Sequence, residues 1–512
     1  MDFDIDRRKL LKATGAGLAT ATIVSGKAGA VTDLNDLPGD GDEENPYEIG
    51  SFDDLLAIDQ DLTANYVLTD HIEFPEEEPP IAPLGFEEEE YEGDNFAFTG
   101  TLDGQGFEIR NFEIEGFSSY TNSGAGLFGN IGEGGTVRNL NIVNIEVSGN
   151  DDVGALVGRF DGGEEGAIEN VSVSGEADGS NPVGGIIGRM VSGIVVDSDA
   201  DVRVEGFENL GGAVGLTQGG TVERSSAEGN VFGGDTNEGG FVGRMDDGSI
   251  NQCYATGDVE GFDNVGGFAG SIDAGTVTQA YAWGDASGFT IAVGGFVGYF
   301  GAGSIVEVYA VGGVVGGEGA GGGLVGEAPE EEEEEETEVG SVTPLQLSMD
   351  VAYWDILATG QQDPIQSGDT GFLGENVEGF DTDDTQGRAD EMTGLDAIEN
   401  MEGFDFEDTW VPVTEDGNFV ISFGADTNTE SYGGVEPAQE DNGDGYPRFG
   451  EPVDEEVCID RRNLSRGQED DECPHDRDLR RGETREELDE RSGRSGRGEH
   501  RDSATERRGR RR

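Results

Sequence analysis

Carboxylates are the side chains most available for chemistry in this chain, which has 110 Asp and Glu against 30 Lys and Arg. A glycosidase needs two carboxylates that lie about 5–10 Å from each other and face the same cleft. Adjacent pairs such as Asp151/Asp152 and Asp246/Asp247 are available. At this density of acid such pairs arise by chance, so they do not by themselves indicate an active site.

A polysaccharide lyase would also need a Lys or Arg to stabilise the negative charge that develops during the reaction. All three lysines lie within the first 27 residues, and residues 31–460 contain only nine arginines. Five of these arginines stand at scattered strand or turn positions in the repeat region: Arg138, Arg159, Arg189, Arg224 and Arg244. We therefore expect no catalytic residues and no enzyme activity, with a polysaccharide-active enzyme as the less favoured alternative.

One acidic segment has the ligand spacing of a calcium loop. It runs from Glu440 to Gly445, and its oxygen ligands would be Glu440, Asn442, Asp444 and Glu451. No helical pattern flanks it and Pro447 interrupts it, so an ordinary turn is favoured. Three scattered histidines, His71, His475 and His500, do not suggest a zinc site. We expect no cofactor, with Ca²⁺ as the weak candidate.

Cysteines and sequons supply the remaining candidate sites. Cys253 falls at a position where other repeats have small or apolar residues, which predicts a place in the core. Cys458 and Cys473 could form a disulfide in an oxidising compartment. Asn170 and Asn463 begin Asn-X-Ser sequons and are candidate glycosylation acceptors.

The net charge of −80 excludes nucleic acid as a partner, because phosphates would be repelled. Residues 31–460 hold 93 acidic residues spread over their whole length. Either the surface is adapted to molar salt, where the Debye length is about 3 Å, or it is a polyanion that binds cations or basic partners. The even spread favours adaptation to salt.

The N-terminus predicts export. Arg7 and Arg8 precede a short, mildly apolar run over residues 13–25, and Ala28-Gly29-Ala30 suggests cleavage after Ala30. The pattern resembles a twin-arginine (Tat) signal, which implies the Tat translocase as a transient partner; a short amphipathic helix is the alternative. The chain has no other apolar run of 18 residues, so we expect no transmembrane segment and an extracellular or cell-surface location.

A glycine-rich cassette that ends apolar-apolar-Gly recurs eight times at intervals of 27–30 residues. The final glycines are Gly129, Gly158, Gly188, Gly215, Gly243, Gly270, Gly298 and Gly326. A fixed period of this size is typical of stacked repeats. Each repeat has room for two or three short strands joined at glycine turns, which predicts an all-β, right-handed parallel β-helix of about eight coils of about 28 residues. Glycine would serve corners that need positive φ and places where coils approach closely.

Within a repeat, two further positions recur. A β-branched residue follows seven positions after the last glycine of several cassettes (Val222, Ile250, Val277 and Ile305), and a small residue follows five positions later (Ala227, Ala255, Ala282 and Ala310). Ahead of the repeats, the pattern predicts short strands near Tyr47–Ile49, Tyr66–Leu68 and Ile72–Phe74, and a short helix at Phe52–Ile58.

These cassettes, the opening segment FTGTLDGQGFEI and the copy from Gly248 to Val259 resemble the GLUG-repeat family of secreted and cell-surface proteins. So does the later run Ala352-Tyr353-Trp354-Asp355 with Thr359-Gly360-Gln361, followed by Trp410 and Gly445-Tyr446-Pro447. The resemblance covers about residues 45–449. It implies a right-handed β-helix and surface or adhesive roles, and it brings no catalytic residues.

The predicted organisation follows from these segments. We expect a signal peptide at 1–30, an acidic linker at 31–44, an N-terminal cap with first coils at 45–123, and the repeat β-helix at 124–326. An acidic loop at 327–340 and a C-terminal cap region at 341–453 would follow. The tail, 454–512, holds 16 arginines and 14 acidic residues from Arg461 onward, a composition typical of disorder.

The sequence as a whole predicts an exported, non-catalytic structural or adhesive β-helix protein. Surface glycans or other cell-surface proteins are the expected partners. Two alternatives remain: a carbohydrate-binding or carbohydrate-active protein on the same scaffold, and a polyanionic cation-binding surface protein.

Overall fold

The computed structural model describes residues 31–75, 80–85, 97–115, 124–289, 292–317, 321–330 and 347–381, and short stretches at 389, 392–393, 397, 400–406, 409–413, 421–423, 445–449 and 458–459. The chain divides into two compact units. The first comprises Met1–Met392 and Met401–Phe404, and the second comprises Thr393–Asn400 and Asp405–Arg512.

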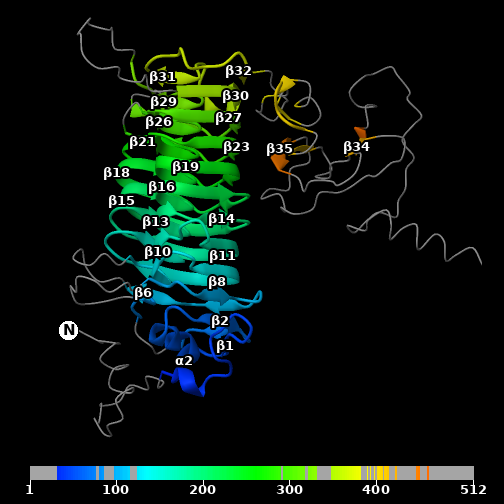
Figure 1. The fold of residues 1–512 in the computed structure, drawn as a ribbon. Helices are drawn as coiled ribbons and strands as arrows, with labels where there is room; N and C mark the ends of the chain where they lie inside the picture. Colours follow the sequence, from blue (N-terminus) through cyan, green and yellow to red (C-terminus); the bar gives the residue numbers. More distant parts are fainter. Residues whose placement is uncertain are drawn as a thin grey trace, which may run out of the picture. The chain divides into compact units, whose positions relative to one another are not determined.

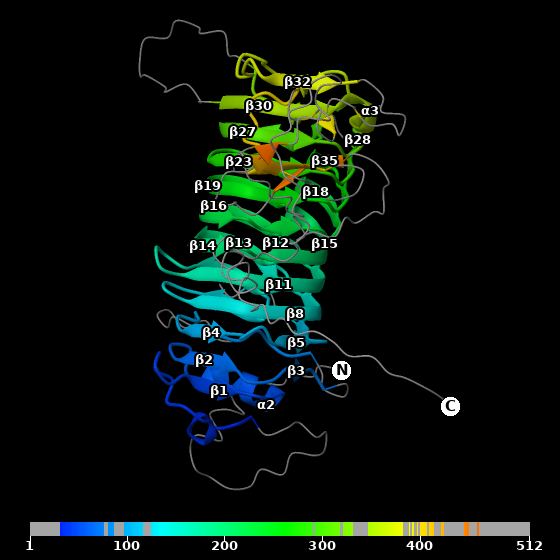
Figure 2. The same cartoon turned by 90° about the vertical axis from the view of Figure 1, so that its right-hand side faces the viewer.

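The first unit is a parallel β-solenoid of about eight turns of about 28 residues, which confirms the predicted fold class (Figure 1). Each strand pairs in parallel with the equivalent strands of the coils before and after it. One column, for example, runs from Ile187 through Val214 and Val242 to Ala269. Figure 2 shows the coils stacked in sequence order from one end of the unit to the other.

The first half of the solenoid contains η1 (Leu34–Asp36), β1 (Tyr47–Ile49), α2 (Phe52–Leu55), η2 (Leu56–Gln60), β2 (Asn65–Leu68), β3 (Ile72–Glu73), β4 (Thr101–Asp103), β5 (Glu108–Arg110), β6 (Glu113–Glu115), β7 (Phe128–Ile131), β8 (Thr136–Ser148), β9 (Val153–Gly154), β10 (Val157–Asp161), β11 (Ala167–Asp178), β12 (Val183–Gly184), β13 (Ile187–Ser192), β14 (Ile194–Val196) and β15 (Asp199–Gly211).

The second half contains β16 (Val214–Glu223), β17 (Ser226–Ala227), β18 (Val231–Gly239), β19 (Val242–Ala255), β20 (Val259–Glu260), β21 (Asp263–Gly266), β22 (Ala269–Ile272), β23 (Thr276–Ala282), β24 (Ala286–Ser287), β25 (Val293–Gly294), β26 (Val297–Phe300), β27 (Gly303–Ala310), β28 (Val314–Val315), β29 (Val325–Glu327), β30 (Leu347–Asp355), α3 (Ile356–Thr359), β31 (Ile365–Ser367) and β32 (Val377–Phe380).

The predicted short helix lies at the N-terminal end of the stack (Figure 1). Ser51 caps α2 by accepting a hydrogen bond from the Asp54 amide at 3.3 Å. The chain then tightens into η2, so the helical segment extends two residues past the predicted end at Ile58. Leu55, Ala57 and Ile58 are fully buried in the same core cluster as the coils. The helix therefore places apolar side chains over the end of the core.

The core consists of columns of equivalent side chains, one from each coil. The first apolar residue of every cassette is buried, with exposures of 0–1%, and these residues are Leu127, Leu156, Ile186, Ala213, Phe241, Phe268, Phe296 and Leu324. The rings of Phe241, Phe268 and Phe296 stack nearly parallel, with centroids 5.0 and 4.8 Å apart. Apolar burial and ring stacking between coils explain why one repeat would not be stable alone.

Cassette glycines are required for close approach between coils and not for positive φ. A Cβ added to Gly267 would stand 2.2 Å from the carbonyl oxygen of Gly295 in the next coil, and one added to Gly240 would stand 2.1 Å from that of Gly267. Positive φ occurs instead at glycines that follow the cassettes, such as Gly248 at 117°. Close approach between coils and positive φ, which the sequence predicts for glycines in general, thus belong to different glycines.

A corner of each coil is turned by a residue other than glycine in the left-handed conformation. The column reads Asn139, Asn170, Asp197, Arg224, Gln252, Gln279, Glu307 and Val351, with φ between 46° and 58°. Asn and Asp tolerate this conformation best. The later members of the column lack that intrinsic preference, so the strands on either side must hold their backbones in place.

A second corner is held by an asparagine ladder. The Nδ2 of Asn209 donates to Oδ1 of Asn181 at 2.7 Å, that of Asn237 to Asn209 at 2.8 Å, and that of Asn264 to Asn237 at 2.9 Å. Each amide group thus links its coil to the preceding one. The bonds at Asn237 lie in a buried part of the corner, where a lost partner is costly.

Replacing Asn237 with alanine should lower the free energy of unfolding by about 2–4 kcal/mol, because it removes two ladder bonds and a side chain suited to positive φ. Urea unfolding in molar salt measures this as a lower midpoint at unchanged slope. Asn141→Ala is the control, since Asn141 makes one exposed bond of 3.3 Å to Gly106. Equal midpoints for the two variants would show that the ladder does not stabilise the stack.

The run Ala352-Tyr353-Trp354-Asp355 ends the regular coils. Buried Asp355 caps α3 by accepting from the amides of Leu357 and Ala358 at 2.8 and 2.9 Å, and its second oxygen accepts from the Ala389 amide at 2.7 Å. Trp354 donates from Nε1 to the carbonyl oxygen of Gln361 at 3.0 Å. These residues of the family-like motif therefore have structural roles.

The described residues of the second unit form two antiparallel strand pairs. β33 (Trp410–Val413) pairs with β35 (Gly445–Phe449), and β34 (Ile421–Phe423) pairs with β36 (Cys458–Ile459). The rings of Trp410 and Phe449 lie 4.6 Å apart between centroids.

Candidate functional site

Most of the predicted site residues outside the repeats lie outside the described residues. These are Arg7, Arg8, Ala30, Glu440, Asn442, Asp444, Glu451, Asn463 and Cys473. Cys458 is placed only by its backbone, in β36. The export signal, the calcium loop, the disulfide and the tail sequon therefore stay predictions.

Asn170 has a defined environment in β11. Its backbone is left-handed, with φ of 52°, and its Nδ2 donates to Oδ1 of Asn139 in the preceding coil at 3.0 Å. The nitrogen that a glycan would modify is thus engaged in a contact between coils. Glycosylation of Asn170 remains a prediction, and it would have to break this hydrogen bond.

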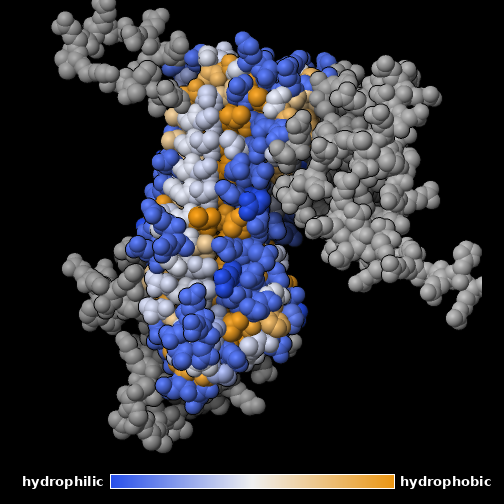
Figure 3. All heavy atoms as spheres, turned by 45° about the vertical axis from the view of Figure 1, so that its right-hand side comes forward, coloured by the Kyte–Doolittle hydropathy of each residue, from blue (hydrophilic) through white to orange (hydrophobic). Residues whose placement is uncertain are grey.

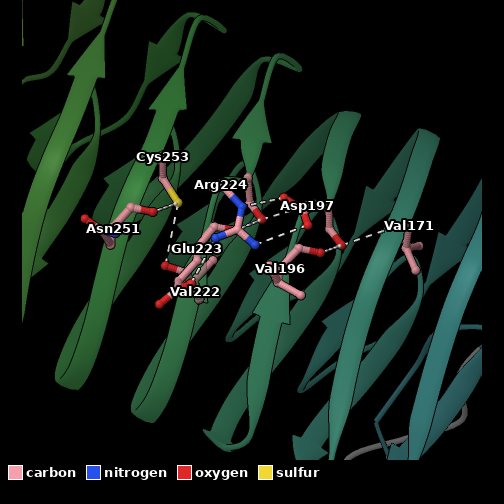
Figure 4. Close-up of polar contacts among 10 residues, drawn as sticks. Val171, Val196, Asp197, Val222, Glu223, Arg224, Asn251 and Cys253 are labelled. Carbon is pink, nitrogen blue, oxygen red and sulfur yellow. Dashed lines mark hydrogen bonds and ion pairs between the residues drawn. The ribbon is translucent and has the colours of Figure 1, made fainter. Parts of the chain in front are cut away.

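Cys253 lies in the core, as its place in the repeat predicted. It belongs to a column with Ser198, Ser225 and Ala280, and its side chain is fully buried. Figure 4 shows the polar contacts around this column. Ser198 Oγ accepts from the Val171 amide at 3.3 Å and donates to the Val196 carbonyl at 3.0 Å, while Cys253 Sγ contacts the Asn251 carbonyl at 3.3 Å.

Burial raises the pKa of Cys253 to about 12, so its reactive thiolate is scarce at neutral pH. The thiol therefore supplies no nucleophile.

Most arginines of the solenoid are paired with carboxylates. The pairs are Arg110–Glu108, Arg138–Asp103, Arg189–Asp152, Arg203–Glu205, Arg224–Asp197 and Arg244–Asp246, and Arg224 and Arg244 each hold a second carboxylate, Glu223 and Asp273. Several join residues 27–37 positions apart, which are neighbours only because coils stack. The scattered arginines thus link adjacent strands and turns.

Three of the four carboxylates weighed as glycosidase candidates are held by hydrogen bonds to neighbouring groups. Asp152 accepts from Arg189 Nε at 2.7 Å; burial raises the pKa of Asp152, and Arg189 and Arg159 act in the opposite direction. Asp246 accepts from Arg244 at 2.7 Å, and Asp247 accepts from the Gly248 amide at 2.8 Å.

Arg159 is the exception among the described arginines of the solenoid, because no ion pair or hydrogen bond holds its guanidinium. It lines a hollow of about 390 Å³ together with Ala97, Asn130, Ile131, Gly132, Glu133, Asp161 and Gly163. β7, β10 and the turns that follow them position all of these residues except Ala97, which precedes β4, and Asn130 is in register with Arg159. Asp161 is held by the Ser192 hydroxyl at 2.6 Å.

This hollow is the candidate functional site. A free guanidinium, two carboxylates and an amide together can donate to and accept from the hydroxyls of a sugar, and the same set of groups is what a lyase-like reaction would require. Sequence reasoning noted Arg159 but missed Glu133 and Asp161. Nothing in the sequence distinguishes these two from the other acidic residues, since only the register of the coils brings them beside Arg159.

A buried carboxylate lies at a different corner. Glu238, in β18, is fully buried, and neither of its oxygens accepts a hydrogen bond within the described structure. It occupies the core column between Leu210 and Val265. Burial raises its pKa to about 8, and nearby amides of Phe262 and Asp235 only partly oppose this. An uncharged carboxyl is therefore favoured at neutral pH.

Three further features bear on function. Among the described residues, no group of three or more His, Cys, Asp and Glu side chains is arranged to hold a metal ion. No helix in the described part of the chain has the length and apolarity needed to cross a membrane. On the face shown in Figure 3, hydrophilic and intermediate residues dominate and apolar residues form small separate patches.

Comparisons with known proteins identify relatives that match part of the chain. No family model matches the chain. Halomucin of Haloquadratum walsbyi is 35% identical over 252 residues, which is 47% of this chain and 3% of that protein. An immunoglobulin A1 protease of Streptococcus pneumoniae is 30% identical over 233 residues, which is 42% of this chain and 11% of that protein. The chain thus spans a small part of the length of both.

Solved structures give a weaker likeness. The structure of an IgA1 protease aligns with a TM-score of 0.36 at 18% identity, covering 65% of this chain and 21% of that chain. A crystal structure from Bacteroides ovatus, assigned to the immunoglobulin A1 proteases, aligns with a TM-score of 0.38 at 17% identity over 72% of this chain and 91% of that chain.

Proposed function

We propose that this protein is an exported, non-catalytic β-solenoid that acts as a structural or adhesive element of the cell surface or extracellular space. One observation carries the proposal: most polar side chains of the described solenoid that could do chemistry are held in contacts within and between coils. Arginines pair with carboxylates of neighbouring coils and strands, asparagines form a ladder, and the serine column and Cys253 bind backbone carbonyls.

The location outside the cell is supported by the relatives and by the N-terminal sequence. One relative is named a mucin and another is named a protease of immunoglobulin A1, and both names fit proteins that work outside cells. The twin-arginine pattern at Arg7 and Arg8 fits transport of a folded protein by the Tat translocase.

The surface charge supports adaptation to molar salt. Halomucin, which is 35% identical to part of this chain, comes from Haloquadratum walsbyi. At a net charge of −80, the acidic side chains would strongly repel one another in dilute buffer. At 1 M salt the Debye length is about 3 Å, so the repulsion is limited to near neighbours. The acidic residues then keep the rod soluble, and the shape presents its faces and corner turns to a partner.

A carbohydrate-binding function is the second candidate, and the hollow at Arg159 favours it. An unpaired guanidinium is conspicuous in a solenoid whose other described arginines are paired. In this alternative, Asn130, Glu133, Arg159 and Asp161 would orient the hydroxyls of a glycan.

Binding to intact cells and to a glycan array in molar salt tests both candidates. We expect the labelled protein to bind cells of the organism that makes it, saturably, and Arg159→Met to bind equally well. Arg224→Met is the matched control for loss of a surface guanidinium. Saturable binding to one glycan that Arg159→Met weakens about tenfold or more and Arg224→Met leaves unchanged would establish the carbohydrate function instead. Absence of any cell binding would overturn the adhesive role.

A further inference from the structure

Three exposed phenylalanines follow one corner of the solenoid. Phe207, Phe262 and Phe289 have exposures of 62%, 47% and 74%, whereas most large apolar side chains of the described solenoid are buried. Each follows a glycine at the equivalent turn of its coil. The rings of Phe262 and Phe289 stack with centroids 5.8 Å apart and planes inclined by 26°. We call these three residues the aromatic column.

The aromatic column has a gap of one coil. The coil between those of Phe207 and Phe262 carries Gly234 at this turn, and an ideal Cβ there would lie 3.3 Å from Cδ1 of Phe207. Since successive coils are about 4.8 Å apart, Phe207 and Phe262 are separated by about 10 Å. The ring of Phe207 reaches toward Gly234, so a planar group seated at this level would contact that ring on one side and face the ring of Phe262 on the other. A cation and a ring attract each other within about 6 Å of the ring centroid.

Charge around the gap selects the kind of group that would enter it. Two exposed carboxylates lie near the gap: Asp235 follows Gly234, and Glu260 precedes Phe262 by two residues. Within the described structure, no ion pair or hydrogen bond engages either carboxylate. A guanidinium already lies over a phenylalanine ring nearby in the solenoid. Arg203 lies over the ring of Phe232 with its guanidinium carbon 4.2 Å from the centroid, and it pairs with Glu205.

We propose that the aromatic column binds an arginine-bearing segment of a partner protein, with a guanidinium plane in the gap between Phe207 and Phe262. Guanidinium is planar and weakly hydrated, so it stacks on rings where a lysine ammonium does not. Asp235 and Glu260 supply the opposite charge. In molar salt the charge attraction is screened, while apolar contact is strengthened by excluded salts.

This inference deepens the adhesive role proposed above by naming the chemistry of one partner. It is tested with purified components. A fluorescent peptide of alternating Arg and Gly is titrated with the full chain in molar salt, beside a peptide with Lys in place of Arg. We expect saturable binding of the Arg peptide and binding of the Lys peptide at least about tenfold weaker. Failure here would leave the cell-binding result unaffected.

Two kinds of variant locate the binding. Gly234→Phe should fill the gap and weaken binding at least about tenfold. A folded product is expected, because the glycine has an ordinary φ, its nearest neighbour is the flexible side chain of Phe207, and the carbonyl oxygen of Gly206 stands at an ordinary contact distance of 3.5 Å. Phe207→Leu with Phe262→Leu keeps the surface apolar but removes both rings, and it should weaken binding to the same degree. Ile194→Phe adds a ring at another exposed position and is the control for a changed surface.

Three results would overturn the proposal. One is equal binding of the Arg and Lys peptides, which would indicate general charge attraction. Another is unchanged binding in both column variants. The third is binding of a neutral oligosaccharide, and not of the Arg peptide, that the column variants abolish, which would assign the column to sugar.

Discussion

Replacement of Gly267 with alanine should lower the free energy of unfolding of the solenoid by about 3–5 kcal/mol. The new methyl carbon would stand 2.2 Å from the carbonyl oxygen of Gly295 and 3.1 Å from Cβ of Ala282. The obstacle is the backbone of the next coil, which cannot rotate away as a side chain could. The coils would have to separate where Gly267 and Phe268 donate to Gly294 and Phe296 at 3.2 and 2.9 Å.

Gly234→Ala provides the matched comparison, because it adds the same methyl group to a glycine of the same solenoid. Its nearest neighbour is a side-chain carbon of Phe207 at 3.3 Å, and its φ is ordinary. We expect a change within about 0.5 kcal/mol. Urea unfolding of both variants in molar salt measures the difference. Similar midpoints would show that the cassette glycines are not needed for contact between coils.

The second large effect is a dependence of stability on pH that Glu238 causes. Its pKa is raised to about 8 in the folded protein by burial, against an ordinary value of 4.5. Between these values the unfolded chain has released the proton and the folded chain still holds it. The folded state therefore loses stability as pH rises through this window, at about 1.4 kcal/mol per pH unit, and by about 5 kcal/mol in total.

Glu238→Leu should abolish this contribution, because leucine is the residue at the equivalent position of the preceding coil. The stability of the variant relative to the original chain should increase steadily from pH 5 to pH 8. Comparing the two chains at each pH cancels the titration of the many other carboxylates. A constant difference across this range would mean that Glu238 titrates normally, and the account of its burial would be wrong. Glu238→Gln, which keeps the shape without the charge, should likewise show no pH-dependent term.

The fold could be predicted because its signal is repeated. The spacing of cassettes at Gly129 through Gly326 implies that equivalent residues stack, and the apolar cassette residues such as Phe241 and Phe268 are indeed buried in columns. The short helix at Phe52 could be predicted from its serine cap and following apolar run. Each of these features depends on local sequence or on the period alone.

Other features depend on the register between coils, which the period does not specify. The left-handed corner at Arg224 and Glu307 has no compositional signal, since neither residue favours that conformation. Glu238 follows a turn that is one residue longer than its neighbours, so its inward direction was not readable from the pattern. Several arginine pairs likewise depend on contacts across 27 or more residues of sequence, so the pattern does not separate Arg159 from the arginines that are paired.

The most direct test of a non-catalytic surface solenoid is a search for reaction products. Purified protein is incubated in molar salt with cell envelopes of the organism that makes it, and glycans and peptides are then analysed by mass spectrometry. The account predicts no new chain ends beyond those found with Arg159→Met. Reducing ends, unsaturated sugar ends or cleaved peptides that the original chain forms and Arg159→Met does not would contradict it.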